Sequence, residues 1–259
     1  MKLIVAPCVL FSAAVASDAR AQAFNIDFGP AGSAPSASYA AAGVAGAWNP
    51  VPLLEPWLRT PLVSVSGAAS TAQLYMFGCD SSFAADDPLT LGDDGALMDD
   101  MLISFNSPVD ACIWVEGLPN GTYEVLTYAM TPGLPTELHR VRVDNATTGP
   151  VMIGGAWPGT HVECVTYARH TVTITGGVIG LHSGLWGANI TSGINGIQVR
   201  RTDGCYPDCN GTGTLTVADF GCFQGKYVLG DLYADCNASG TLTVADFGCF
   251  QGHFVIGCP

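Results

Sequence analysis

Two stretches near the end of the chain carry oxygen-bearing residues at matching positions. Residues 208–219 read DCNGTGTLTVAD, and residues 235–246 read DCNASGTLTVAD. Calcium takes six to eight oxygen ligands, which a twelve-residue loop supplies from positions 1, 3, 5, 7, 9 and 12, with Gly at position 6 for the turn. Both stretches fit this spacing and predict two bound Ca²⁺ ions. The predicted ligands are Asp208, Asn210, Thr212, Thr214 through its carbonyl, Thr216 and Asp219 in the first loop, and Asp235, Asn237, Ser239, Thr241 through its carbonyl, Thr243 and Asp246 in the second.

Each of these loops brings two carboxylates. Position 5 is a hydroxyl residue in both loops, and position 12 is Asp, one methylene shorter than the usual Glu. Since affinity follows the charge and rigidity of the ligand set, we expect binding near ~10⁻⁴ M, in the range of extracellular modules. The alternative is a loop that keeps its turn and holds no metal.

The segment GTLTVADFGCFQG occurs twice, beginning at Gly213 and again at Gly240. Such self-similarity at a period of 27 residues indicates a duplicated structural unit. Aromatic residues at i, i+3 and i+7 after each loop predict a helix with one apolar face, which we expect to form the core of the unit. These residues are Phe220, Phe223 and Tyr227, then Phe247, Phe250 and Phe254.

Six cysteines crowd into the last 55 residues of the chain. This density in a short segment predicts a disulfide-stapled module in an oxidising compartment. A zinc site is the alternative, but the segment has no CxxC pair and His253 is its single histidine. Six cysteines allow 15 pairings, and spacing does not choose among them. The candidates are Cys205, Cys209, Cys222, Cys236, Cys249 and Cys258.

Residues 205–259 resemble a known family. The duplicated loop and helix, the CxxDCN opening, the DFGCFQ helix and the terminal Cys258-Pro259 are similar to the cysteine-containing, GC-type dockerins of planctomycete-type bacteria. The resemblance implies calcium-dependent folding and docking onto a cohesin-like receptor, on the cell surface or on a scaffold. In cellulosomal dockerins, loop positions 10 and 11 help select the receptor. Here these positions hold Val217-Ala218 and Val244-Ala245 instead of the usual Ser-Thr type pair.

Residues 22–201 predict a separate all-β domain, because short alternating runs are punctuated by Gly, Pro and Asn. The segments FNIDFG, LMDDMLIS, VEGLPNGTYEVLTYA, HRVRV and INGIQV resemble galactose-binding-like jelly rolls, which are common as carbohydrate-binding modules. The expected fold class is therefore mainly β: a jelly-roll β-sandwich followed by a small α module of two EF-hand-like loop-helix repeats. The predicted strands are 24–28, 62–66, 102–105, 112–116, 123–128, 139–143, 171–175, 178–181 and 196–200.

Aromatic rings that stack on sugar C–H faces are the expected ligand-binding groups of such a domain. Four tryptophans lie in Pro-containing or Gly-rich stretches that predict loops: Trp48, Trp57, Trp157 and Trp186. The alternative for each is burial in the core, where Trp is found most often. Trp114 lies in the middle of a predicted strand, and we expect it in the core.

An acidic run at Asp93, Asp94, Asp99 and Asp100 has two interpretations, a solvated turn or a structural calcium site. No catalytic motif accompanies it. The chain has no GxSxG and no HExxH, and its glutamates form no recognisable pair for glycoside hydrolysis. This favours a binding protein over an enzyme.

The N-terminus and the charge indicate export. Lys2 precedes a mostly apolar run, and Ala19-Arg20-Ala21 has the small-x-small form of a cleavage site, so residues 1–21 predict a signal peptide. A net charge of −13 argues against nucleic acid as a partner. No later stretch predicts a transmembrane span.

Three functions fit a secreted or cell-surface-attached chain of this kind. The favoured one is a dockerin-anchored protein that binds carbohydrate or a surface partner. The alternatives are a polysaccharide-degrading enzyme, of glycoside hydrolase or lyase type, and a structural envelope protein.

Overall fold

The computed structural model of the chain describes residues 23–29, 32–105, 110–131, 133–184, 192–202, 206–210, 215–237 and 239–256. The predicted signal peptide and the candidates Trp186, Thr212, Thr214, Cys205 and Cys258 lie outside these residues. In the described part of the chain, no helix is both long enough and apolar enough to span a bilayer.

The described chain is mainly β. Its elements are β1 (Ala23–Asp27), β2 (Trp48–Pro50), β3 (Thr60–Val63), β4 (Ala69–Phe77), β5 (Ser81–Ala84), α1 (Asp93–Met98), β6 (Asp100–Ser104), β7 (Ala111–Glu116), β8 (Gly121–Tyr128), β9 (Leu138–Val143), β10 (Val151–Gly154), β11 (Tyr167–Ile174), β12 (Val178–Ser183), β13 (Ser192–Ile194), β14 (Gly196–Arg201), α2 (Val217–Val228), a 3₁₀ turn (Leu232–Ala234) and α3 (Val244–Ile256).

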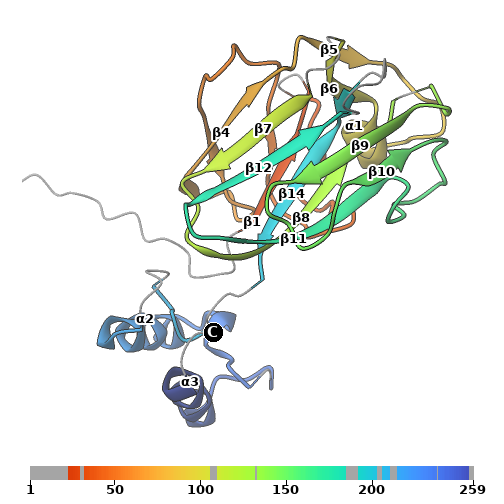
Figure 1. Cartoon of the computed structure of the whole chain (residues 1–259). Helices are drawn as coiled ribbons and strands as arrows, with labels where there is room; N and C mark the ends of the chain where they lie inside the picture. The colour runs from red at the N-terminus through yellow and green to blue at the C-terminus, as the bar shows by residue number, and fades with distance from the viewer. Residues whose placement is uncertain are drawn as a thin grey trace, which may run out of the picture.

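Two sheets pack in a sandwich-like arrangement (Figure 1). One has the strand order β11-β8-β14-β1-β2, and the other has the order β10-β9-β12-β7-β4-β3. The pairings are antiparallel except that of β1 with β2. A smaller sheet, β13-β6-β5, lies with α1 at one end of the sandwich (Figure 1).

The core lies between the sheets because alternate residues of each strand face inward. On β7, Ile113 and Val115 are buried, whereas Trp114 and Glu116 are half-buried on the opposite face. The prediction that Trp114 belongs to the core is therefore wrong, since the aliphatic neighbours take the inward positions. The inward residues form one cluster that spans both sheets.

Each of the nine predicted strands overlaps an observed strand, and five further strands were not predicted: β2, β4, β5, β10 and β13. The acidic run is not a solvated turn. Asp93 and Asp94 occupy the first turn of α1, and Asp93 Oδ1 accepts a hydrogen bond from the Ser36 amide at 2.7 Å. Asp100 is buried at the start of β6.

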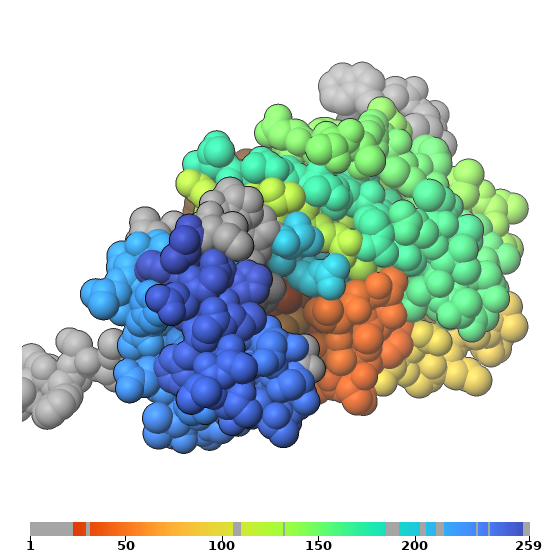
Figure 2. Space-filling model, turned by 90° about the horizontal axis from the view of Figure 1, so that it is seen from below, coloured from red at the N-terminus to blue at the C-terminus, as the bar shows by residue number. Residues whose placement is uncertain are grey.

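Helices α2 and α3 form a small lobe with its own core, seen in blue in Figure 2. Phe223 and Phe250 are fully buried, and their rings stack with centroids 4.2 Å apart. The remaining predicted aromatic residues surround them, partly buried. The prediction that the aromatic stripe forms the core of this module is confirmed.

The two-sheet core gives a direct test of the fold. Leu74 is fully buried on β4, so Leu74→Ala should lower the free energy of unfolding by about 2–5 kcal/mol through lost transfer energy and the cavity it leaves. Met152, 40% exposed on β10, serves as the control, and Met152→Ala should change it by less than about 0.5 kcal/mol. Urea titration followed by tryptophan fluorescence measures both. Equal effects of the two substitutions would contradict this core.

Candidate functional sites

An exposed group of aromatic side chains covers part of the outer face of the six-stranded sheet. Tyr75 and Phe77 face outward from β4 and Trp114 from β7, and Trp57, from the segment before β3, lies against all three. The Trp57 ring stacks on Phe77 and on Trp114, with centroid distances of 5.1 and 5.5 Å. Trp57 is 53% exposed and Phe77 is 42% exposed. We call these four residues the aromatic face.

Trp57 is held in an unfavourable backbone conformation. Its φ of 67° lies in the left-handed region, which bulky residues rarely adopt. Its backbone N–H donates to the carbonyl oxygen of Met76 at 3.1 Å, which fixes the segment against β4. Strain of this kind concentrates at functional positions. An exposed, strained Trp therefore marks this face as a candidate binding surface.

A shallow groove of about 440 Å³ adjoins Tyr75. Its polar lining includes Thr71, Gln73 and Glu116. Arg59 donates to Glu116 Oε1 at 2.5 Å and lies over the Tyr75 ring at 4.8 Å. The groove thus sets amide, hydroxyl and carboxylate groups beside an aromatic surface. Such a surface can stack on the C–H face of a ligand while the polar groups bind its hydroxyls.

A polar network borders the aromatic face beyond Trp114. His182 Nε2 lies 3.0 Å from Asp144 Oδ2, and His182 Nδ1 lies 3.2 Å from Cys112 Sγ. This order resembles a nucleophile–base–acid relay. However, burial raises the pKa of the Cys112 thiol to about 11, so the thiol stays protonated at neutral pH. The network therefore offers hydrogen-bonding groups rather than a thiolate nucleophile.

The predicted tryptophans occupy different environments. Trp48 lies on β2 rather than in a loop; it is buried, and its indole N–H donates to the Tyr39 carbonyl oxygen at 3.2 Å. Trp157 is half-buried and lines a separate depression of about 260 Å³, together with Thr90 and Asp99. Of the three described candidates, Trp57 is thus the most exposed to a ligand.

Four of the predicted ligand residues of the second calcium loop are in contact. Ser239 Oγ lies 3.4 Å from Asp235 Oδ1 and 3.1 Å from the Thr241 carbonyl oxygen. The Ser239 amide donates to Asp235 Oδ1 at 2.9 Å and to Asn237 Oδ1 at 3.0 Å. Oxygen ligands held 2.3–2.6 Å from one Ca²⁺ lie roughly 3.4 Å apart when neighbouring, so the spacing of Asp235, Ser239 and Thr241 is compatible with three of the six predicted ligands.

The last carboxylate of each loop is enclosed by backbone amides. Asp246 accepts the Thr243 amide at 2.7 Å, and this bond holds the pKa of the Asp246 carboxyl below its ordinary value. Asp219 accepts the Thr216 amide at 2.8 Å and completes a capping box at the start of α2. The same carboxylates thus cap helices and face the loops, and the caps stabilise this backbone with or without a metal.

The first loop is described in part. Asp208 is 4% exposed, and the amide of Asn210 donates to Asp219 Oδ1 at 3.1 Å, the counterpart of the bond from Asn237 to Asp246 in the second loop. Thr212 and Thr214 lie outside the described residues. The parallel bonds show that the described parts of the duplicated loops share one backbone arrangement.

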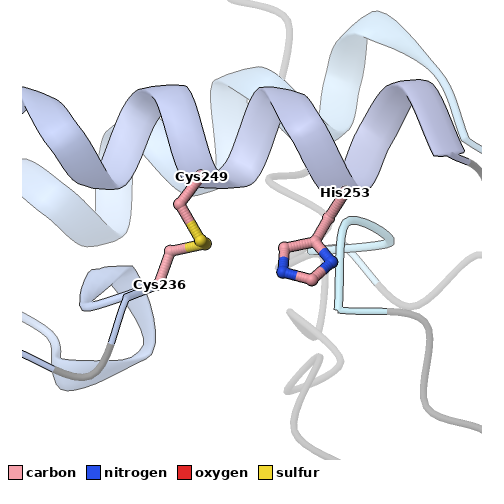
Figure 3. Close-up of side chains that lie close together, drawn as sticks. All are labelled: Cys236, Cys249 and His253. Carbon is pink, nitrogen blue, oxygen red and sulfur yellow. A yellow bond between two sulfur atoms is a disulfide. The ribbon is translucent and has the colours of Figure 1, made fainter.

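Two disulfides staple the repeats. Cys209 bonds to Cys222, and Cys236 bonds to Cys249, each joining a loop to the helix that follows it. His253 lies beside the second disulfide (Figure 3). Because the two sulfurs there are bonded to each other, they are not available as thiolates, so the alternative of a zinc site does not fit.

One pattern in the sequence could have predicted part of the aromatic face. Along β4, Ala72, Leu74 and Met76 are buried, which leaves Tyr75 and Phe77 on the outer side. This alternation can be recognised in the sequence and predicts which side chains face outward. Nothing local in the sequence, however, indicates that Trp57 folds over the same strand.

No protein-family model matches the chain, and no curated protein matches it. Among the solved structures that resemble it, three do so at 12% identity over 70% of this chain. They are Bacillus subtilis protein YXIM (TM-score 0.42, 40% of that chain), a calcium-binding mutant of Bacteroides uniformis β-glucuronidase 2 (0.43, 18%) and the plant receptor-like kinase FER (0.40, 42%). The chain thus spans less than half of each, and similarity at this level carries no argument about function.

The disulfide pairing can be checked chemically. Peptide mapping of the non-reduced protein should recover the linked pairs Cys209–Cys222 and Cys236–Cys249, which reduction separates. A peptide that links one repeat to the other through these four cysteines would contradict the arrangement.

Proposed function

We propose that the chain is an exported binding protein. Its sandwich, of the galactose-binding-like jelly-roll kind, binds a polysaccharide on the aromatic face. Its C-terminal module, a dockerin folded around two Ca²⁺ ions, docks onto a cohesin-like receptor at the cell surface or on a scaffold. The observation that carries the proposal is the exposed stack of Trp57 on Phe77 and Trp114 beside a polar groove. Two disulfides fit an oxidising compartment.

The chemistry of the groove favours a neutral glycan and binding over cleavage. The net charge of −13 repels anionic polysaccharides. Among the described residues that line the groove, Glu116 is the single carboxylate, and Arg59 is bonded to it. Glycoside hydrolysis usually requires two carboxylates across the scissile bond. Among the described residues, the lining of the groove therefore offers no second acid for the enzymatic alternative.

The docking role is supported by the exposed ends of the two helices. Val217 and Val244 open α2 and α3 and are 85% and 84% exposed. They occupy loop position 10, which helps select the receptor in the dockerins that the module resembles. Apolar side chains this exposed, repeated symmetrically, suit a contact with a partner. Replacing both by Asp should abolish docking while leaving calcium binding intact.

Polysaccharide binding predicts a specific pattern of substitutions. Trp57→Ala should weaken binding of a neutral polysaccharide at least tenfold, or about 1.4 kcal/mol, because it removes the outermost ring of the stack. Met152→Ala, of similar exposure on the same sheet, should leave affinity unchanged. Affinity electrophoresis over a panel of neutral and acidic polysaccharides measures both. Release of reducing ends would favour the enzyme instead, and no retardation by any member would contradict the proposal.

Calcium binding predicts a gain in stability. At a free calcium concentration 100 times Kd, each loop should add about 2.7 kcal/mol to the free energy of unfolding of the module. This gain should be visible as a higher Tm than that of the chelator-treated chain. Asp208→Ala with Asp235→Ala should remove this gain, and these position-1 residues avoid the helix caps made by Asp219 and Asp246. Glu55→Ala, which removes one exposed carboxylate outside the loops, is the control. Retention of the full calcium response in the double variant would show that the ligands are misassigned.

A further inference from the structure

A second set of acidic oxygens is buried inside the sandwich domain. Asp27 ends β1 and is fully buried, and in the described chain its carboxylate oxygens meet no hydrogen-bond donor besides the nearby Ser33 hydroxyl. A carboxylate in that position loses most of its hydration without replacement, which costs several kcal/mol unless the charge is neutralised. Buried polar groups are otherwise almost always paired. Asp27 therefore needs a proton or a cation.

Asp100 brings a second carboxylate to the same place. It begins β6, is 8% exposed, and its Oδ1 also lacks a partner. The Asn195 side-chain amide donates to the Asp100 carbonyl oxygen at 2.8 Å, while the Asn195 carbonyl oxygen accepts the Phe28 amide at 2.8 Å. This bridge holds the start of β6 beside the end of β1, although the two segments are far apart in the sequence.

Ser33 and Gly29 complete the surroundings. A Cβ added to Gly29 would lie 2.0 Å from Asp100 Oδ2 and 2.6 Å from Ser33 Oγ, so both oxygens lie against the bare Cα of this glycine. The Ser33 hydroxyl interacts with both carboxylates. Two carboxylates and one hydroxyl, with five oxygen atoms in all, thus interact in this buried place.

The electrostatics of this cluster are unfavourable without a cation. Burial, and then the neighbouring charge of Asp100, raise the pKa of Asp27 to about 8. Burial raises the pKa of Asp100 to about 6, and the charge of Asp99 adds to this. In the part of the chain that the structure describes, no Lys, Arg or His forms an ion pair with Asp27 or Asp100.

We propose that Asp27, Asp100 and Ser33 bind a hard divalent cation of the calcium class inside the sandwich, independently of the C-terminal loops. An all-oxygen donor set of carboxylates and a hydroxyl selects Ca²⁺, Mg²⁺ or Mn²⁺ rather than softer metals. A single shared proton would satisfy the two carboxylates less completely, because it leaves further Asp27 oxygen lone pairs unpaired. A cation engages several of these oxygens at once and joins β1 to β6.

Metal counting separates this site from the loops. The Asp208→Ala, Asp235→Ala chain, dialysed with Ca²⁺ and then freed of excess ion, should retain one Ca²⁺ by elemental mass spectrometry. Adding Asp27→Asn and Asp100→Asn should reduce the count to zero, whereas Glu55→Gln should leave it at one. Gly29→Ala keeps both carboxylates but places a methyl group against Asp100, and it should also lose the ion. The loop ions do not enter these counts, because every variant also carries the two loop substitutions.

Thermal stability distinguishes a cation from a proton. A bound cation stabilises the folded chain by mass action, whereas a shared proton leaves its stability independent of calcium. Calcium should therefore raise the Tm of the loop-deficient chain, and Asp27→Asn should abolish this calcium effect. A count of zero in the loop-deficient chain, with the same Tm in calcium and in chelator at pH 8, would overturn the proposal and leave a shared proton.

Discussion

Strict alternation of side chains along β4 and β7 is the constraint on which the aromatic face depends. Leu74, Ile113 and Val115 must face the second sheet, because that is where the apolar core lies. The residues between them, Tyr75 and Trp114, are thereby forced outward. A strand that slipped by one residue would bury these rings and expose the aliphatic residues. The stability of the core thus fixes the aromatic face as a consequence, and Trp57 folds onto a platform that already exists.

Local and non-local features differed in how far the sequence revealed them. The aromatic core of the C-terminal module could be predicted because the repeat, the loop spacing and the aromatic stripe are all local features of the sequence. The buried stack of Phe223 on Phe250 confirmed this core. The sequence did not predict the disulfide pairs or the proximity of Asp27 to Asp100, since both depend on which segments the fold brings together. Trp48 was misplaced for the same reason: its stretch looked like a loop, but it pairs with β1 as a strand.

The carboxylates of the chain show how one residue type serves different roles according to its donors. Asp246 receives backbone amides, and its pKa is held below its ordinary value, so it is ionised and can serve both a helix cap and an ion. Asp27 receives none, and its pKa is raised to about 8. We propose a divalent cation at both places: in the loops the oxygens are held by backbone amides, and in the sandwich the carboxylates are buried without such amides. Metal would then stabilise both parts of a chain whose C-terminal module is too small to rely on its core alone.

Hydroxyl-radical footprinting of the intact chain, with and without a bound neutral polysaccharide, tests the central claim most directly. Trp57, Phe77 and Tyr75 should become protected together when the ligand is present, because it covers the outer side of β4. Trp157, in the separate depression, should react at the same rate in both samples. Protection of Trp157 with unchanged reactivity of Trp57 would place the ligand elsewhere and contradict the account.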